Sequence, residues 1–219
     1  MNAQTIATTT HGRYLVHPPH TAHPPNAPLL VGCHGYAESA EQMLERLMPI
    51  PGVERWRIAS VQALNRFYQR RTDAVVAGWM TRQDRELAIA DNVAYVSAIV
   101  ETIARESGEP RALVFAGFSQ GVSMAFRAAA ASPRRVDAVV AAGGDVPPEI
   151  ADAALRRCGR VLLCHGHSDE WYTPNTFAAD VARLRRAGLD PRAIEFDGGH
   201  EWHAAVVAAA GEWLAEVAR

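Results

Sequence analysis

The feature that most constrains the fold of this 219-residue chain is a series of short apolar runs separated by helical patterns. Because these runs are continuous rather than alternating, each strand must be covered on both faces, as in a parallel sheet. The pattern predicts a doubly wound α/β fold with helices on both faces of a mostly parallel sheet. The predicted strands are Arg13–Val16, Leu29–Cys33, Arg57–Val61, Ala112–Ala116, Val136–Ala142, Val161–Cys164 and Ala193–Phe196.

The segments between these runs have the spacing of amphipathic helices. Apolar residues recur every three or four positions from Ile89 to Ile103, with Thr81-x-x-Asp84 as the start signal and Gly108 as the stop. A further helix is predicted over 173–187, beginning near Pro174 with Thr173 as its cap, and a last one near the C-terminus. Strands and helices thus alternate along the chain.

The organisation of the chain favours one domain over residues 1–219. Its length fits one large α/β domain, and it contains no internal repeat. The proline- and histidine-rich stretch 17–28 is predicted to be a surface connection, because proline fixes φ and removes a backbone donor. Its histidines at 17, 20 and 23 are interpreted as surface residues rather than as a metal site, since the prolines prevent a helical face.

Charge and composition limit the partners and the compartment. The net charge of -2, with dispersed basic residues, gives no reason to expect nucleic acid or an acidic membrane as a partner. No signal-peptide pattern and no apolar run of ~20 residues is present, so a cytoplasmic protein without a membrane span is expected. Cys33, Cys158 and Cys164 are predicted to be buried free thiols. A homodimer stays an open alternative, because the sequence carries no signal for the oligomeric state.

All 22 basic residues are arginine, because the chain contains no lysine. A Walker-A lysine, a pyridoxal-phosphate Schiff base and a Ser-Lys pair each need an amine, which the permanently charged guanidinium cannot replace. These three classes of enzyme are excluded, and a nucleophilic serine would need histidine as its base.

The strongest local signal is the pentapeptide GFSQG at 117–121, which joins the strand Ala112–Ala116 to a helix-forming run. Its glycines permit a sharp, strained turn that lifts a serine hydroxyl above the edge of the sheet. The N-terminus of the helix then lies beneath the hydroxyl, with backbone N–H groups aimed at a developing oxyanion. Ser119 is therefore the predicted nucleophile, and the amide of Gln120 is the first predicted oxyanion donor.

A serine nucleophile needs a base that is itself oriented by a carboxylate. Asp169 follows one predicted strand in the loop HGHSDEW, and His200 follows the next in the loop DGGHEW. Both lie beyond the carboxyl ends of strands, where open sheets build their sites, and the order Ser119, Asp169, His200 is that of α/β hydrolases. Asp145 and Asp197 are the fallback carboxylates. The rival base, His203, is expected one turn inside the terminal helix.

The second oxyanion donor should come from the loop after an earlier strand, where His34-Gly35 makes the chain turn and the amide of Tyr36 faces the site. The motifs HGYAES, GFSQG, HGHSDEWYTP and FDGGHEW together resemble the carboxylesterase/phospholipase group of α/β hydrolases, the relatives of acyl-protein thioesterases. The resemblance covers nearly the whole chain. It implies the α/β-hydrolase fold with a minimal lid, no cofactor or metal, and an oxyanion hole made by the amides of Tyr36 and Gln120. His34 is expected to bond the loop backbone.

The sequence predicts a serine hydrolase that cleaves a small-molecule carboxylic ester or thioester through an acyl-enzyme intermediate. Tyr36 replaces the leucine usual in acyl-protein thioesterases, and AVVAGWMTRQDREL departs from their pattern, so long-chain acyl specificity is not implied. Five large side chains near the predicted site loops are candidates for the walls of an apolar acyl or aryl pocket, with core packing as the alternative. These are Trp79, Met80, Phe118, Trp171 and Tyr172.

Three other functions are alternatives to this one. His165-x-His167-x-Asp169 resembles the metal motif of metallo-β-lactamase-fold hydrolases, but Glu170 stands where that family has a further histidine. A ligand receptor with the same fold would bind without turnover. A cysteine-dependent relative of dienelactone hydrolase would need cysteine at the position of Ser119.

Overall fold

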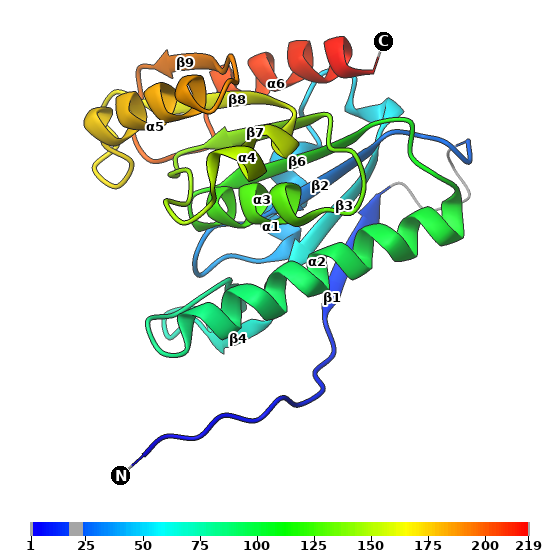
Figure 1. The fold of residues 1–219 in the computed structure, drawn as a ribbon, viewed down its shortest axis with the longest axis vertical. Helices are drawn as coiled ribbons and strands as arrows, with labels where there is room; N and C mark the ends of the chain where they lie inside the picture. The colour runs from blue at the N-terminus through cyan, green and yellow to red at the C-terminus, as the bar shows by residue number, and fades with distance from the viewer. Residues whose placement is uncertain (1, 18–23, 219) are drawn as a thin grey trace.

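The computed structural model describes residues 2–17 and 24–218, built around a seven-stranded sheet (Figure 1). Its strand order is β1-β3-β2-β6-β7-β8-β9; β1 runs antiparallel to β3, and the other neighbours are parallel. The predicted mostly parallel sheet is therefore confirmed. The strands are β1 (Arg13–His17), β2 (Leu29–Cys33), β3 (Arg57–Gln62), β6 (Leu113–Phe118), β7 (Ala138–Ala142), β8 (Arg160–Gly166) and β9 (Arg192–Phe196).

Helices cover both faces of this sheet, and each face has its own apolar core. On one face, side chains such as Val96, Phe126 and Leu184 pack with the sheet, and on the other face Met43 and Trp213 do so. Continuous burial of strands such as β2 and β6 follows from this double cover. The helices are α1 (Ala40–Leu47), α2 (Arg85–Ser107), α3 (Gln120–Ala131), α4 (Asp152–Leu155), α5 (Pro174–Arg186) and α6 (Ala204–Val217).

The helix boundaries follow the predicted caps at most ends. Thr173 caps α5 by accepting a hydrogen bond from the amide of Thr176, and Gly108 ends α2 with a φ of 84°. The start of α2 was predicted wrongly: the Thr81 hydroxyl donates to the carbonyl of Gln83, and the helix begins four residues later, after Asp84. His203 is also not inside a helix, because it is the N-cap of α6.

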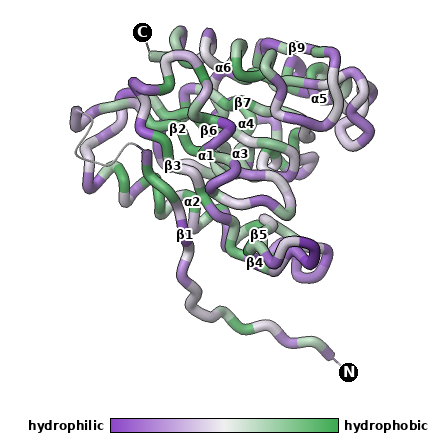
Figure 2. Tube along the Cα trace, turned by 180° about the vertical axis from the view of Figure 1, so that it is seen from behind, coloured by the Kyte–Doolittle hydropathy of each residue, from purple (hydrophilic) through white to green (hydrophobic). Residues whose placement is uncertain are grey.

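A two-stranded hairpin beside the sheet has no counterpart among the predicted strands. It consists of β4 (Asn65–Tyr68) and β5 (Val75–Gly78), which pair antiparallel. The turn between them is among the most hydrophilic parts of the chain (Figure 2). The amide of Ala37 donates to the carbonyl of Ala77, and the amide of Ala77 donates to the carbonyl of Glu38. These bonds fix the hairpin against the loop that follows β2.

Contrary to the expectation from the sequence, α2 has the length and apolar composition that a membrane-spanning helix needs. The core helices of globular proteins also meet that criterion. Here Val96, Ile99 and Val100 are buried in the core on one face of the sheet. The three cysteines, Cys33, Cys158 and Cys164, are buried free thiols, as predicted.

Candidate active site

The turn between β6 and α3 holds Ser119 in a strained backbone conformation. Its φ is 52° and its ψ is -122°, values that L-residues rarely adopt. The flanking glycines are required for this turn, because a Cβ on Gly117 would lie 2.4 Å from the carbonyl oxygen of Gly121. A Cβ on Gly121 would lie 2.1 Å from the carbonyl oxygen of Cys33. The packing of backbone on backbone thus fixes where the serine hydroxyl stands.

The structure brings Ser119, His200 and Asp169 into one hydrogen-bonded chain. His200 Nε2 lies 2.9 Å from Ser119 Oγ, and His200 Nδ1 lies 2.8 Å from Asp169 Oδ2. Because His200 Nδ1–H donates a hydrogen bond to the carboxylate, Nε2 is left free to accept the proton of the serine hydroxyl. This arrangement activates a serine hydroxyl as a nucleophile.

The carboxylate of Asp169 is fixed by the backbone of its own loop. Its side chain is 1% exposed, and Oδ1 accepts hydrogen bonds from the amides of Trp171 and Tyr172 at 2.8 and 2.9 Å. These two bonds occupy one carboxylate oxygen and leave Oδ2 to His200. The alternative carboxylates do not reach His200: Asp145 and Asp197 are exposed, and Asp197 bonds His167 instead.

The amide of Gln120 belongs to the first residue of α3, so it has no partner within the helix. The amide of Tyr36 makes no hydrogen bond among the described residues, whereas the amide of Gly35 donates to Glu38 and that of Ala37 donates to Ala77. Both predicted oxyanion donors are thus available.

His34 shapes the turn that carries Tyr36. The amide of Ala63 donates to His34 Nε2 at 3.1 Å, so the proton of the ring lies on Nδ1, which donates to the carbonyl of Gly35 at 2.6 Å. The ring is completely buried, and burial lowers the pKa of His34, with the bond to Gly35 opposing this shift. His34 is therefore a neutral residue that bonds the loop backbone, as predicted.

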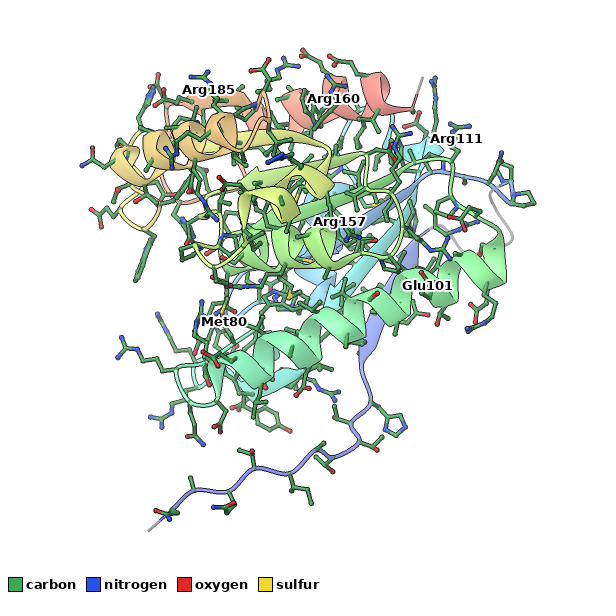
Figure 3. All side chains as sticks on the ribbon, viewed as in Figure 1. Met80, Glu101, Arg111, Arg157, Arg160 and Arg185 are labelled. Carbon is green, nitrogen blue, oxygen red and sulfur yellow. The ribbon has the colours of Figure 1, made fainter. Side chains whose placement is uncertain are left out.

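A cavity of about 420 Å³ lies beside Ser119 and His200. Of the five predicted wall residues, Met80, Trp171 and Tyr172 line it, and Trp171 is 83% exposed. Met80 lies near the start of α2 (Figure 3). The cavity is not the apolar pocket that was predicted, because polar and charged side chains supply much of its wall. These are Arg85, Gln120, Ser123, Arg127, Asp145 and Thr176.

The other two predicted wall residues are part of the core. Trp79 is buried, and its Nε1 donates to the carbonyl of His34 at 2.7 Å. Phe118 is also buried, with its ring 5.1 Å from that of His200 and 4.4 Å from the guanidinium carbon of Arg46. Both support the site without facing the cavity, which is the core-packing alternative considered for each of them.

The predicted rival metal site has no converging set of ligands. Among the residues that the structure describes, no group of three His, Cys, Asp or Glu side chains is placed to hold a metal ion. The ring of His165 is buried and stacks on Phe177 at 5.0 Å. His203 accepts a bond from the amide of Ala205. His20 and His23 lie outside the described residues.

Arg85 and Arg127 are the site residues that sequence reasoning missed. An arginine in a helix is usually solvated, so neither position stood out. A signal for Arg127 was nevertheless present, because Ser123 and Arg127 follow Ser119 at spacings of four residues and so share one side of a helix.

Comparison with known families and structures is consistent with this geometry. A family model described as Phospholipase/Carboxylesterase matches residues 20–200. A carboxylesterase from Mesorhizobium loti has a TM-score of 0.77 and 19% identity, over 93% of this chain and 94% of that one. Acyl-protein thioesterase 2 of Zea mays has a TM-score of 0.71 and 18% identity, over 94% of this chain and 99% of that one.

A carboxylesterase from Bacillus cereus has a TM-score of 0.73 and 15% identity, and the match covers 94% of each chain. At such identities these likenesses establish a shared fold, and the α/β-hydrolase fold expected from the sequence is confirmed. No curated protein matches the sequence of this chain.

Proposed function

Because the chain belongs to the phospholipase/carboxylesterase family, matching its model over residues 20–200, we propose that it is a serine hydrolase that cleaves carboxylic esters or thioesters through an acyl-enzyme intermediate. The observation that carries this proposal is the hydrogen-bonded chain from Asp169 through His200 to Ser119. The strained elbow that presents Ser119 gives further support, since backbone strain of this kind is concentrated at functional sites.

In the proposed acylation, Ser119 Oγ attacks the ester carbonyl while His200 Nε2 takes the hydroxyl proton. The tetrahedral intermediate then collapses, the bond to the alcohol or thiol breaks, and His200 delivers its proton to that leaving group. In deacylation a water molecule replaces the serine as the nucleophile, and the same histidine transfers its proton to Ser119. Asp169 keeps the imidazole in the required tautomer and stabilises the imidazolium that forms.

The negative charge of the tetrahedral intermediate falls on the former carbonyl oxygen. We assign the amides of Tyr36 and Gln120 to bind it, because both lack another hydrogen-bond acceptor within the described structure. The N-terminus of α3 adds its dipole at the same point. Since these groups are fixed before the reaction, they stabilise the charge without reorganisation.

The test is turnover of 4-nitrophenyl esters and labelling by a fluorophosphonate, for the wild type and for Ser119→Ala. We expect the wild type to be labelled at Ser119, and the variant to lose labelling and to fall in kcat by on the order of 10⁴-fold or more. Full activity in the variant would refute the proposal. Tight ester binding without turnover in the wild type would favour a ligand receptor instead.

A further inference from the structure

The cavity beside Ser119 contains two arginines that the proposed chemistry does not use. Arg127 lies on α3, and Arg85 is the first residue of α2. Because Ser123 and Arg127 follow Ser119 at spacings of four residues and all three line the cavity, the cavity extends along one side of α3. Ser119 and Arg127 therefore lie in the wall of the same cavity.

Arg127 is a buried cation that binds one carboxylate through two of its three guanidinium nitrogens. Its side chain is 5% exposed, and Glu149, which is 47% exposed, accepts from Nε at 2.7 Å and pairs with Nη2 at 2.6 Å. The third nitrogen, Nη1, donates to the sulfur of Met80 at 3.6 Å. A thioether is a weak acceptor, so this nitrogen lacks a strong one in the described structure. Burial lowers the pKa of Arg127, which reflects the cost of holding the charge there.

Arg85 adds a second positive charge to the same cavity. Its side chain is exposed and makes no ion pair or hydrogen bond with the described residues. It is close enough to Arg127 to disfavour the charge on that guanidinium. Among the described residues, the only acidic side chain that lines the cavity is Asp145, which is exposed. Two arginines and one carboxylate thus line the cavity beside the serine, while Glu149, the ionic partner of Arg127, is not part of its lining.

We propose that the preferred substrate is an ester or thioester that carries a carboxylate, and that Arg127 and Arg85 bind this carboxylate while Ser119 attacks the ester carbonyl. This inference rests on the proposed serine chemistry. A carboxylate supplies the acceptor that Nη1 of Arg127 lacks, and guanidinium groups bind carboxylates through charge-assisted, often paired hydrogen bonds.

The spacing of the two sites determines the shape of such a substrate. Arg127 lies eight residues beyond Ser119, or about 12 Å along the helix axis. Because side chains on a helix lean back toward its N-terminus, we expect the guanidinium to lie nearer to Ser119 than the Cα of Arg127 does. A short alkyl chain between the ester and the carboxylate therefore fits the cavity better than a long acyl tail.

The experiment compares charged esters with neutral analogues of the same shape. On the acyl side, the 4-nitrophenyl half-ester of adipic acid is compared with its methyl-capped form. On the alcohol side, the butyrate ester of 6-hydroxyhexanoate is compared with its methyl ester. We expect kcat/KM to favour the charged member of at least one pair by about 10- to 100-fold. The pair that shows the preference identifies which part of the substrate carries the carboxylate.

Variants then test the two arginines. Arg85→Gln and Arg127→Gln should each lower the ratio of charged to neutral kcat/KM by about tenfold or more, and Arg127→Lys should give an intermediate ratio because it keeps the charge but loses the planar fork. Arg105→Gln is the matched control, since Arg105 is exposed in the last turn of α2, the helix that begins with Arg85, and does not line this cavity. Its ratio should stay within about twofold of the wild type.

The possible outcomes separate the two proposals. Equal kcat/KM within both pairs, or an unchanged ratio in Arg85→Gln and Arg127→Gln, would overturn the carboxylate site and leave the serine chemistry intact. Failure to cleave any ester, with no labelling of Ser119, would refute the proposed function itself. If Arg127→Gln does not fold, the ratio measured for Arg85→Gln still tests the carboxylate site, because the side chain of Arg85 is exposed and its replacement should not affect folding.

Discussion

The serine elbow and the wall that faces it are built in different ways. At the elbow, residues 117–121, backbone packs directly on backbone, and a Cβ on either glycine would meet another backbone atom within 2.5 Å. The wall, residues 79–85, is held by the side chain of Gln120, which accepts from the amide of Trp79 at 2.8 Å and donates to the carbonyl of Met80 at 3.2 Å. Residues 81–85 of the wall are exposed.

The two kinds of packing suit two different requirements of an enzyme site, precise placement of the attacking atom and adaptable binding of the rest of the substrate. The attacking atom must be placed within a fraction of an ångström, and close backbone packing is suited to that. The wall that receives the rest of a substrate can tolerate adjustment, and side-chain contacts with a flexible methionine permit it. We therefore expect substitutions in the elbow or in the residues that activate Ser119 to abolish activity or folding. Substitutions in the wall should alter the selectivity for substrates.

The largest effect is expected from Asp169→Asn. Because Oδ1 accepts two backbone amides, the new amide nitrogen must take the place of Oδ2 and donate to His200 Nδ1. The imidazole then carries its proton on Nε2 and cannot accept one from Ser119. We expect kcat for 4-nitrophenyl esters to fall by about 10⁴-fold with little change in secondary structure.

Asp197→Asn is the matched control for this variant, since Asp197 is an exposed carboxylate that bonds His167. It should change kcat less than about threefold. A loss of under tenfold in Asp169→Asn would show that Asp169 does not fix the tautomer of His200.

Gly121→Ala should have the next largest effect, measured as stability. The new methyl group would lie 2.1 Å from the carbonyl oxygen of Cys33 and 2.5 Å from that of His34. Neither backbone group can move without disturbing β2, so the free energy of unfolding should fall by about 3 kcal/mol. Urea denaturation monitors the change.

Gly199→Ala provides the comparison for this measurement, because the nearest atom to its added Cβ is 3.8 Å away. Its cost should be less than about 1 kcal/mol. Equal costs in the two variants would contradict the description of the elbow as locked by backbone packing.

Gln120→Leu should weaken the wall while leaving the Gln120 amide in place. The amide of Trp79 loses its acceptor, which costs about 1–3 kcal/mol where the group stays buried. We expect KM to rise about tenfold and kcat to change less, because the nucleophile keeps its own support. Gln120→Glu retains the acceptor for Trp79 and should give a smaller rise in KM; the reverse order would argue against the proposed contact.

The smallest effect concerns His34, between the elbow and the wall. Burial lowers its pKa, so below about pH 6.5, the ordinary value for histidine, the unfolded chain binds more protons at this residue than the folded chain does. Its contribution to stability is thus present at neutral pH and is lost as the pH falls. The urea midpoint should drop less on acidification in His34→Gln than in the wild type, and an equal drop would refute the assignment.

The fold, the elbow and the residues that activate Ser119 could be predicted from the sequence because their signals are local. Strands buried on both faces give continuous apolar runs, and the Leu29–Cys33 strand was predicted with its observed bounds. The elbow requires glycines at fixed positions, and residues 169 and 200 follow strands whose ends meet at one edge of the sheet. The capping of α5 by Thr173 was a local signal of the same kind.

The wall could not be read in the same way. Trp79 and Phe118 were assigned to the pocket because they are large and apolar, but those properties also suit the core, where both lie. Arg127 was overlooked because its burial depends on Glu149 and Met80, which are distant in the sequence. The short β4–β5 hairpin is mostly exposed at β4, so it lacks the apolar run that marks the other strands.

The exposed indole of Trp171 gives this protein an optical reporter at the mouth of the cavity. Trp56, Trp79 and Trp213 are buried, and Trp202 is half-buried, whereas Trp171 is 83% exposed. A collisional quencher dissolved in water therefore reaches mainly one of the five emitters. A ligand in the cavity would protect the fluorescence of Trp171 from the quencher. This protection would report directly how much of the cavity is occupied, without any bond being cleaved.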